Sequence, residues 1–493
     1  MQIEFIAGSL DSLGEEAVVV LAWEGQLWSD ELRTADRKME GAITRTFKTS
    51  RFTGAPGEVL EWLAPAGLSV DRLLLVGAGP REPAGPLAIE AAAARALKAV
   101  QTSGAKAVQV LLNEETAALA AQAAYAMVLA AYRFDRYRTK EKATAKPSVN
   151  SIKIVTRDPQ AARAAYAKLA PVAAAVYFTR DLVSEPPNVL FPAEFARRVR
   201  ELEKLGLVVE VLDEAALRQL KMEALLSVGQ GSRRESQLVV IRWNGGAPDE
   251  PPVAFVGKGV CFDSGGITLK AGKGMESMKW DMAGAAAVAG VLHALAGRKA
   301  RVNAVGVLGL VENMPDGNAQ RPADVLTSMS GQTIEIISTD AEGRVVLADA
   351  LWYCQSRFRP RAMIDVATLT GASQVALGVE YSALFTNDAK LAAGLLAAGQ
   401  AEDELLWQLP LSKRLEKQLD SAIADMKNLP EPAGGAISAA LFLQRFTNNT
   451  AWAHLDITPT TWLSPSLVAT VPDGASGYGV RLLNRWVADN CES

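Results

Sequence analysis

The stretch Ser338-Thr339-Asp340-Ala341-Glu342-Gly343-Arg344 runs directly into an apolar, helix-like segment, and this 493-residue chain is organised around it. It holds two acidic residues two positions apart, followed by a glycine and an arginine. If the stretch enters as an extended strand, Asp340 and Glu342 point to the same side. Two converging carboxylates suit a hard divalent cation or acid–base chemistry. The alternative is that both acids only favour a helix start, where the helix dipole stabilises negative charge.

A second acid-bearing stretch leaves an apolar strand predicted at residues 253–256. It reads Gly257-Lys258-Gly259-Val260-Cys261-Phe262-Asp263-Ser264-Gly265-Gly266, with Lys270 and Asp281 beyond it. The first two glycines predict a turn with a close backbone approach, and the last two let the chain fold back around Asp263. The alternative is a salt bridge between Lys258 and Asp263, with Asp281 capping a helix.

Together the two stretches predict a metal centre. Four carboxylates and two lysines are expected at strand ends of one sheet, and ligands of open α/β sheets gather at the carboxyl ends of strands. Carboxylates packed this closely repel one another unless cations neutralise them. Two divalent ions about 3.5 Å apart would do so, and a water shared between them would be a nucleophile near neutral pH.

The composition argues against several classes of protein, namely nucleic-acid-binding, membrane-attached and secreted proteins. The chain is 49% hydrophobic, 22% charged and 6% aromatic, and its net charge of -4 gives no basic footprint for nucleic acid or for membrane attachment. The first residues lack the pattern of a secretory signal, and the apolar window at residues 117–132 is short for a membrane span, which favours a buried helix. Three distant cysteines argue against a disulfide framework and favour the cytoplasm. With only two histidines, a metal must rely on oxygen ligands, with lysine as a further candidate.

Alternating strand-like and helix-like segments predict an α/β fold with largely parallel sheets. We expect an N-terminal α/β domain at residues 1–157, a helical linker at 158–182 in which Pro171 ends one helix or starts another, and a second domain at 183–493. The predicted strands lie at residues 1–6, 17–21, 72–76, 107–112 and 151–155 in the first domain, and at 207–211, 238–242, 253–256, 302–310 and 362–366 in the second. The predicted helices lie at 88–100, 115–132, 281–295 and 343–356.

From Arg180 to Leu483 the sequence resembles the leucyl aminopeptidase family of dinuclear metallopeptidases. The blocks that carry the resemblance are residues 181–188, 257–270, 312–315, 338–345 and 367–371. The family hallmark Asn-Thr-Asp-Ala-Glu-Gly-Arg-Leu differs here only at its ends, where Ser338 and Val345 stand. The resemblance implies a smaller, macro-like N-terminal domain and a larger catalytic domain with a mixed, largely parallel central sheet flanked by helices.

The resemblance also implies a set of metal ligands. A tighter-binding ion would be held by Lys258, Asp263, Asp281 and Glu342. A more exchangeable ion would be held by Asp263, Asp340 and Glu342, with the Asp340 carbonyl as a further ligand. A lysine ligand must be neutral although its reference pKa is about 10.4. Burial and two adjacent cations would both lower that pKa.

The remaining residues of the family pattern are implied to bind or process substrate. Lys270 would polarise the scissile carbonyl, and Arg344 would hold a bicarbonate that shuttles the proton. Met278, Thr368 and Gly371 would line the substrate site together with Lys270 and Asp281. Ordinary core packing is the alternative for Met278.

The activity implied is release of N-terminal, leucine-like amino acids from peptides by a metal-bridging hydroxide, with the free amine bound at one metal. Manganese or zinc, a cytoplasmic location and a homohexamer of two stacked trimers are implied as well. Two alternatives stay open. One is another dinuclear hydrolase, such as a phosphoesterase. The other is a DNA-binding architectural role like that of some family members, against which the acidic net charge argues.

Overall fold

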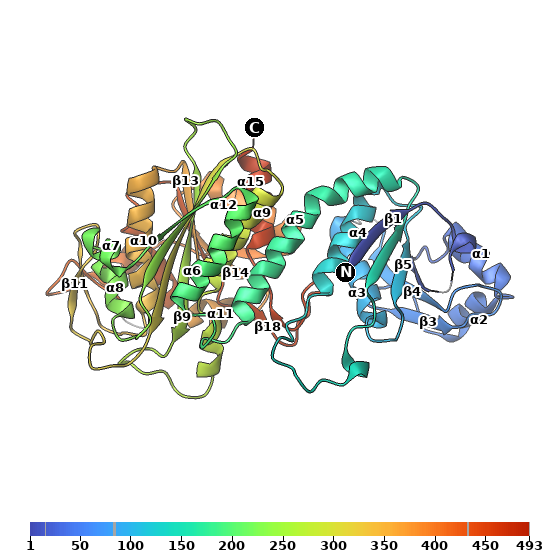
Figure 1. Ribbon diagram of the computed structural model, residues 1–493, viewed down its shortest axis with the longest axis horizontal. Helices are drawn as coiled ribbons and strands as arrows, with labels where there is room; N and C mark the ends of the chain where they lie inside the picture. Colours follow the sequence, from blue (N-terminus) through green and yellow to red (C-terminus); the bar gives the residue numbers. More distant parts are fainter. Residues whose placement is uncertain (15, 82–84, 431–432, 493) are drawn as a thin grey trace. The chain divides into compact units, whose positions relative to one another are not determined.

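The computed structural model describes residues 1–14, 16–81, 85–430 and 433–492, which form two compact units (Figure 1). Unit 1 comprises Met1–Ala173 and Pro465–Asp473, and unit 2 comprises Ala174–Ser464 and Gly474–Ser493. A late segment of the chain thus belongs to the N-terminal unit, where Ala469 packs against the core.

Unit 1 is built on a sheet in the order β1-β6-β5-β2-β4-β3. All neighbouring strands are parallel except β3 and β4, so the expected parallel sheet is confirmed. The strands are β1 (Gln2–Ile6), β2 (Ala17–Glu24), β3 (Val59–Leu63), β4 (Arg72–Pro80), β5 (Ala107–Leu111) and β6 (Ser151–Val155). One core cluster involves α1 (Asp30–Lys38) and α2 (Ala42–Thr49), and another involves α3 (Pro86–Val100) and α4 (Ala117–Ala130).

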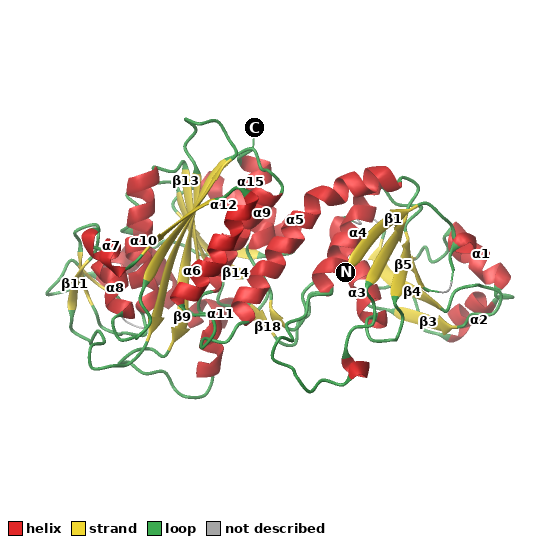
Figure 2. Cartoon of the chain, in the orientation of Figure 1, coloured by secondary structure: helices red, strands yellow, loops and turns green. Residues whose placement is uncertain are grey.

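The helix α5 (Pro159–Ser184) corrects the prediction for Pro171. We expected a helix to end or begin there, but α5 continues through the proline (Figure 2). Proline removes one intrahelical hydrogen bond, and that loss alone does not end a helix whose flanking residues are good helix formers. The alanine-rich sequence on both sides of Pro171 provides such residues. The helix ends at Ser184, two residues beyond the predicted end of the helical linker, and Glu185-Pro186-Pro187 follow it.

Unit 2 is built on a mixed sheet in the order β15-β14-β17-β13-β9-β10-β8-β7. The central strands β17, β13, β9 and β10 are mutually parallel, so their carboxyl ends lie along one edge. The strand β7 lies at the edge of the sheet, and its Val208 is 42% exposed. The strands are β7 (Val208–Leu212), β8 (Gln237–Asn244), β9 (Val253–Asp263), β10 (Asn303–Asn313), β13 (Ala362–Ala367), β14 (Ser382–Thr386), β15 (Leu406–Gln408) and β17 (Trp452–Asp456).

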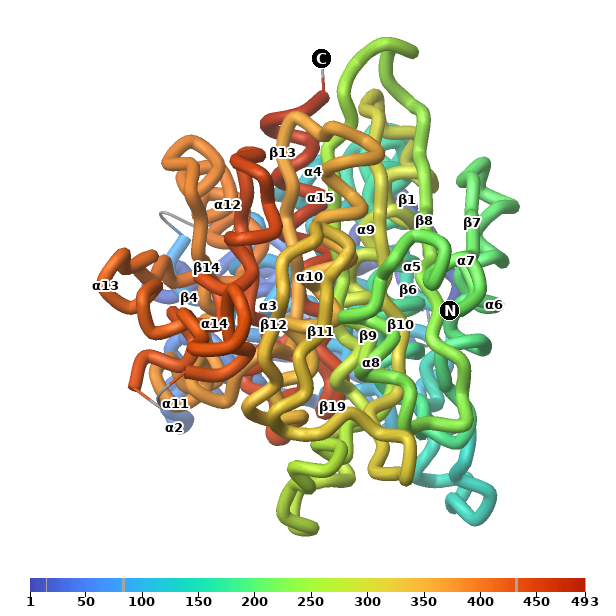
Figure 3. The backbone as a smooth tube through the Cα atoms, turned by 90° about the vertical axis from the view of Figure 1, so that its left-hand side faces the viewer, coloured from blue at the N-terminus to red at the C-terminus, as the bar shows by residue number. Residues whose placement is uncertain are grey.

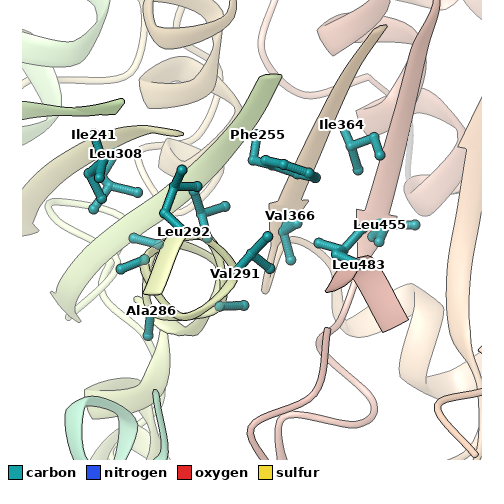
Figure 4. Close-up of a cluster of buried hydrophobic side chains, with 14 of the residues drawn as sticks. Ile241, Phe255, Ala286, Val291, Leu292, Leu308, Ile364, Val366, Leu455 and Leu483 are labelled. Carbon is teal, nitrogen blue, oxygen red and sulfur yellow. The ribbon is translucent and has the colours of Figure 1, made fainter. Parts of the chain in front are cut away.

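Helices cover both faces of this sheet and bury it in two clusters. Figure 4 shows side chains of one cluster, including Phe255, Val291 and Leu483. This cluster involves α6 (Pro192–Arg200), α9 (Ala283–Gly297), α12 (Ala389–Glu402) and α15 (Val480–Asn490). The other cluster involves α7 (Glu214–Gln219), α8 (Glu223–Gly229), α10 (Glu342–Phe358) and α14 (Gly435–Gln444), and Figure 3 shows unit 2 from the side of α10. Burial on both faces explains the nearly continuous apolar strands.

Smaller elements surround the sheet. A three-stranded sheet is formed by β11 (Val325–Thr327), β12 (Thr333–Glu335) and β16 (Met426–Lys427), and a two-stranded one by β18 (Trp462–Leu463) and β19 (Gly474–Ala475). Short helices are α11 (Gly371–Leu377) and α13 (Lys413–Glu416).

One helical stretch, Met275–Gly297, is long and apolar enough to cross a membrane by length and composition, but 83% of its most apolar window is buried inside the protein. It includes α9, a core helix of unit 2. The apolar window at residues 117–132, predicted to be a buried helix, is α4, and most of its side chains are buried.

Candidate metal centre

The strand β9 carries two of the expected ligands and corrects the prediction of a turn at Gly257 and Gly259. Both glycines lie within the strand, which continues to Asp263. A Cβ on Gly257 would lie 2.5 Å from Ala285 Cα, and one on Gly259 would lie 2.4 Å from Leu310 Cδ2. These glycines therefore permit the close packing of α9 and β10 on the strand, as expected for their backbone approach, but they do not turn the chain.

The chain reverses after Asp263, as predicted, at Gly265 and Gly266, which have φ values of +86° and +65°. The loop that follows is joined to the loop bearing Asp340 by Thr339, whose Oγ1 donates to Gly265 O at 2.6 Å and accepts from Thr268 N at 2.8 Å. The two acid-bearing loops therefore hold each other in place.

The stretch through Asp340 and Glu342 does not enter as an extended strand, and the alternative of a helix start holds for Glu342. Residues 339–340 form a turn, and Glu342 is the first residue of α10. The preceding strand, β12, belongs to the three-stranded sheet and not to the central one. The two acids are nevertheless close to Asp263, because ligand atoms of all three residues lie within 4.8 Å of one another. A turn and a helix start bring them together where alternation along a strand was expected to do so.

Each of two lysines contacts two of these acids. The predicted alternative, a salt bridge between Lys258 and Asp263, is not formed: Lys258 contacts Asp281 and Glu342. Lys258 Nζ lies 2.8 Å from Asp281 Oδ1 and 3.0 Å from Glu342 Oε1, and it donates to Thr368 O at 2.7 Å. Lys270 Nζ lies 2.7 Å from Asp263 Oδ2 and also pairs with Asp340.

Burial makes the charges in this cluster costly. Burial, with the nearby charge of Asp263, raises the pKa of Glu342 to about 8. Burial likewise raises the pKa of Asp281 to about 6, although Lys258 opposes the shift. Burial alone would lower the pKa of Lys258, but Asp281 and Glu342 raise it above its ordinary value. Glu342, Asp281 and Lys258 therefore hold their protons to a higher pH than they would in water, and additional positive charge at the cluster would displace these protons.

The side chains fit divalent cations. Asp281 is 6% exposed, and its Oδ2 has no hydrogen-bond partner among the described residues. A buried carboxylate oxygen without a partner is unfavourable unless a ligand completes it. The donors are mostly carboxylate oxygens, which bind manganese, magnesium and zinc.

Arg344 lies in the first turn of α10 and is 5% exposed. It donates from one terminal nitrogen to Asn428 O at 2.9 Å, whereas its Nε has no partner among the described residues. Burial lowers its pKa to about 10 although Glu342 and Asp456 favour the cation. Arg344 is therefore a buried cation whose Nε–H group is available as a hydrogen-bond donor, and such a group can bind an anion.

The three residues expected to line the substrate site come from separate elements. Thr368 is 6% exposed and donates to Asp281 Oδ1 at 2.7 Å, so it contacts the acid cluster directly. Gly371 starts α11, is exposed, and a Cβ built on it would meet no atom within 4 Å. Met278 is half-buried in a short 3-10 helix, Met275–Trp280, that ends beside Asp281.

Sequence reasoning missed two buried asparagines that hold the Asp340 loop. Asn428 accepts from Ile337 N at 2.8 Å and donates to Ser338 O at 2.7 Å. Asn313 donates to Asp263 Oδ1 at 2.8 Å and to Thr339 O at 3.0 Å. Asn428 carries no signal in the sequence, whereas Asn313 lies in one of the blocks that resemble the leucyl aminopeptidase family.

The α/β fold and an acid cluster beside the carboxyl end of β9 that suits divalent ions are features of a metal-dependent hydrolase. Comparison with known proteins then gives the family: residues 177–484 match the catalytic domain of the cytosol aminopeptidase family, and residues 19–141 match its N-terminal domain. The chain belongs to the cytosol aminopeptidase family and is a metal-dependent aminopeptidase. The resemblance to the leucyl aminopeptidase family is thereby confirmed.

Individual relatives agree with this assignment. A probable cytosol aminopeptidase of Caulobacter vibrioides is 58% identical over all of both chains. The structure of the bottromycin maturation enzyme BotP in complex with Mn is 35% identical, with a TM-score of 0.85, covering 97% of this chain and 99% of that one. A mutant of tomato leucine aminopeptidase is 30% identical, with a TM-score of 0.88, covering 99% and 97%.

Proposed function

We propose that this aminopeptidase holds two divalent ions and removes leucine-like residues from the free N-termini of peptides. The ligands would be Lys258, Asp263, Asp281, Asp340 and Glu342. The observation that carries the proposal is the buried contact of Lys258 with both Asp281 and Glu342, beside the three-acid group of Asp263, Asp340 and Glu342. The Mn complex of BotP supports manganese, and the oxygen-rich donor set leaves zinc as the other candidate.

When bound, the two ions would neutralise the carboxylates and supply an activated water for attack on the peptide bond. The chain's own residues would decide which bond is attacked. Asp281 Oδ2, which has no partner among the described residues, would bind an ion, and Asp281 would thereby help to hold the N-terminal amine of the peptide at that ion. Thr368 donates to the other oxygen of Asp281 and so leaves Oδ2 to face the ion. An amine held there would set the first peptide bond at the centre.

Two cations would act on the reacting groups. The side chain of Lys270 is 23% exposed, so it can reach a substrate carbonyl once the ions replace its contacts with Asp263 and Asp340. It would polarise that carbonyl and stabilise the developing oxyanion. Arg344 would hold a bicarbonate through its unused donor, and this anion would accept and return a proton.

A substrate comparison with the manganese-loaded chain tests the proposal. We expect rapid hydrolysis of leucyl amide, loss of at least about 100-fold in kcat/KM with N-acetyl-leucyl amide, and no hydrolysis of a phosphate ester. Equal rates with leucyl amide and N-acetyl-leucyl amide would refute the proposal that the free N-terminal amine positions the first peptide bond. Rapid phosphate ester hydrolysis would favour the second candidate, a broader dinuclear hydrolase.

We also propose that the chain acts in the cytoplasm as a homohexamer and does not bind nucleic acid. The names of the curated relatives support the location, and the net charge of -4 argues against nucleic acid. Light scattering should give six times the 52.4 kDa chain mass, and a monomeric mass would refute the assembly.

A further inference from the structure

Asn313 ends β10 directly beside Asp263, which ends β9, and the two residues are register partners in the central sheet. Asn313 is 1% exposed. Its side-chain nitrogen donates to Asp263 Oδ1 at 2.8 Å and to Thr339 O at 3.0 Å. Because both partners are acceptors, the amide orientation is fixed by chemistry: only the nitrogen can face them. Both hydrogens of the amide are therefore used to join the two acid-bearing loops.

The hydrogen bond from Asn313 gives the two carboxylate oxygens of Asp263 different surroundings. Oδ1 accepts from Asn313 and also from Gly265 N at 2.9 Å, so it is turned toward the protein. Oδ2 faces Lys270 Nζ at 2.7 Å on the side of the acid cluster. A carboxylate held in this way is oriented before any ion arrives, which removes part of the entropy loss on binding.

The bond to Thr339 acts on the other loop. The carbonyl of Thr339 immediately precedes Asp340, so holding it restricts the backbone that carries this acid. The neighbouring turn makes room for the amide, because a Cβ on Gly266 would lie 2.8 Å from Asn313 Oδ1. One buried amide thus sets the distance between an acid of β9 and the loop bearing Asp340.

We infer that Asn313 is a positioning residue of the metal centre, which presents Asp263 Oδ2 to the ions and fixes the Asp340 loop against β9. The inference rests on the proposed two-ion centre and deepens it. Asn313 binds no ion itself. Removing a group that orients a ligand typically lowers metal affinity by about 10–100-fold, so this is the expected size of the effect.

The same strand offers a matched control. Asn303 is at the opposite end of β10, is 8% exposed, and its side chain donates to the backbone oxygens of Ala247 and Glu250 and accepts from Gly246 N. Replacing it removes a comparable set of buried amide hydrogen bonds from the far end of the strand. An effect that comes only from weakening the sheet would be shared by both variants.

The test is calorimetric titration of Mn²⁺ into the metal-free full-length protein for the wild type, Asn313→Leu and Asn303→Leu. We expect Asn313→Leu to weaken Mn²⁺ binding about 10–100-fold and Asn303→Leu to bind as the wild type does. Saturating Mn²⁺ should restore much of kcat for leucyl amide in Asn313→Leu. Asn313→Ala provides the same measurement if the leucine variant does not fold.

Unchanged Mn²⁺ affinity in a folded Asn313 variant, or an equal loss in the Asn303 variant, would overturn the inference. Wild-type protein that binds no Mn²⁺ pair would instead overturn the proposed two-ion centre. The two failures are therefore distinguishable within one experiment.

Discussion

Lys258 and Glu342 meet inside unit 2 with Nζ 3.0 Å from Oε1, and each side chain is only 3% exposed. One comes from the middle of the strand β9 and the other from the first turn of α10. The ammonium group also contacts Asp281 at 2.8 Å, so one lysine is shared between two buried acids. Any ion that binds these carboxylates would therefore have to displace the protons that Lys258 and Glu342 hold through their raised pKa values.

Replacing Lys258 with methionine should therefore abolish tight binding of one ion. The variant keeps the apolar stem but loses both the proposed ligand and the charge that balances Asp281 and Glu342. We expect a fall of at least about 100-fold in kcat/KM for leucyl amide and the loss of one ion per chain. Metal analysis after dialysis measures the latter. Retention of both ions would show that Lys258 is not a ligand.

Metal binding should strengthen as pH rises toward 8. Glu342 has a raised pKa of about 8, so below that pH the folded, metal-free protein mostly carries a proton there. An ion that binds the carboxylate must release this proton, and each released proton changes the apparent affinity about tenfold per pH unit. Mn²⁺ titrations between pH 6.5 and 8.5 should show this slope and proton release. An affinity independent of pH would contradict the role of Glu342.

Arg344 should affect turnover more than metal content. Arg344→Met removes the buried cation and its bond to Asn428 O but no proposed ligand. We expect two bound ions, a lower kcat, and loss of any stimulation of the wild type by added bicarbonate. Steady-state kinetics at several bicarbonate concentrations measure this. A variant that still responds to bicarbonate as the wild type does would show that the anion binds elsewhere.

Asp349 should make stability depend on pH. It is fully buried and accepts from Leu225 N and Met329 N, yet burial raises its pKa to about 7. Because the folded state binds this proton more tightly than the unfolded state, the stabilisation is complete below about pH 4 and is lost as pH rises to about 7.

Asp349→Asn cannot titrate, so its stability deficit relative to the wild type should shrink between those pH values, by on the order of a few kcal/mol. Denaturant unfolding of both proteins at pH 5 and pH 8 measures the change. A deficit that is the same at both pH values would contradict the assignment.

The sequence was sufficient to predict two α/β domains with largely parallel sheets and to identify the acidic residues of the candidate metal centre. Buried strands such as β9 and β13 are apolar runs, and Asp263 and Glu342 stand beside glycines that mark close approaches. The sequence was insufficient to predict the backbone conformation where that conformation depends on hydrogen bonds to residues far away in the sequence. Asn428 holds residues 337–338 through hydrogen bonds that have no local pattern, so the turn before Glu342 cannot be predicted from the adjacent residues. Pro171 by itself predicts a helix boundary, whereas the alanine-rich sequence on both sides of it continues the helix α5 through the proline.

The most direct test of the two-ion centre is metal content together with leucyl amide hydrolysis in Glu342→Ala. Glu276→Ala is the control, because Glu276 is an exposed acid of the nearby helix Met275–Trp280. We predict that the wild type and the control bind two ions and hydrolyse the amide, whereas a folded Glu342→Ala protein does neither. A Glu342→Ala protein that retains two ions and full hydrolysis would contradict the account.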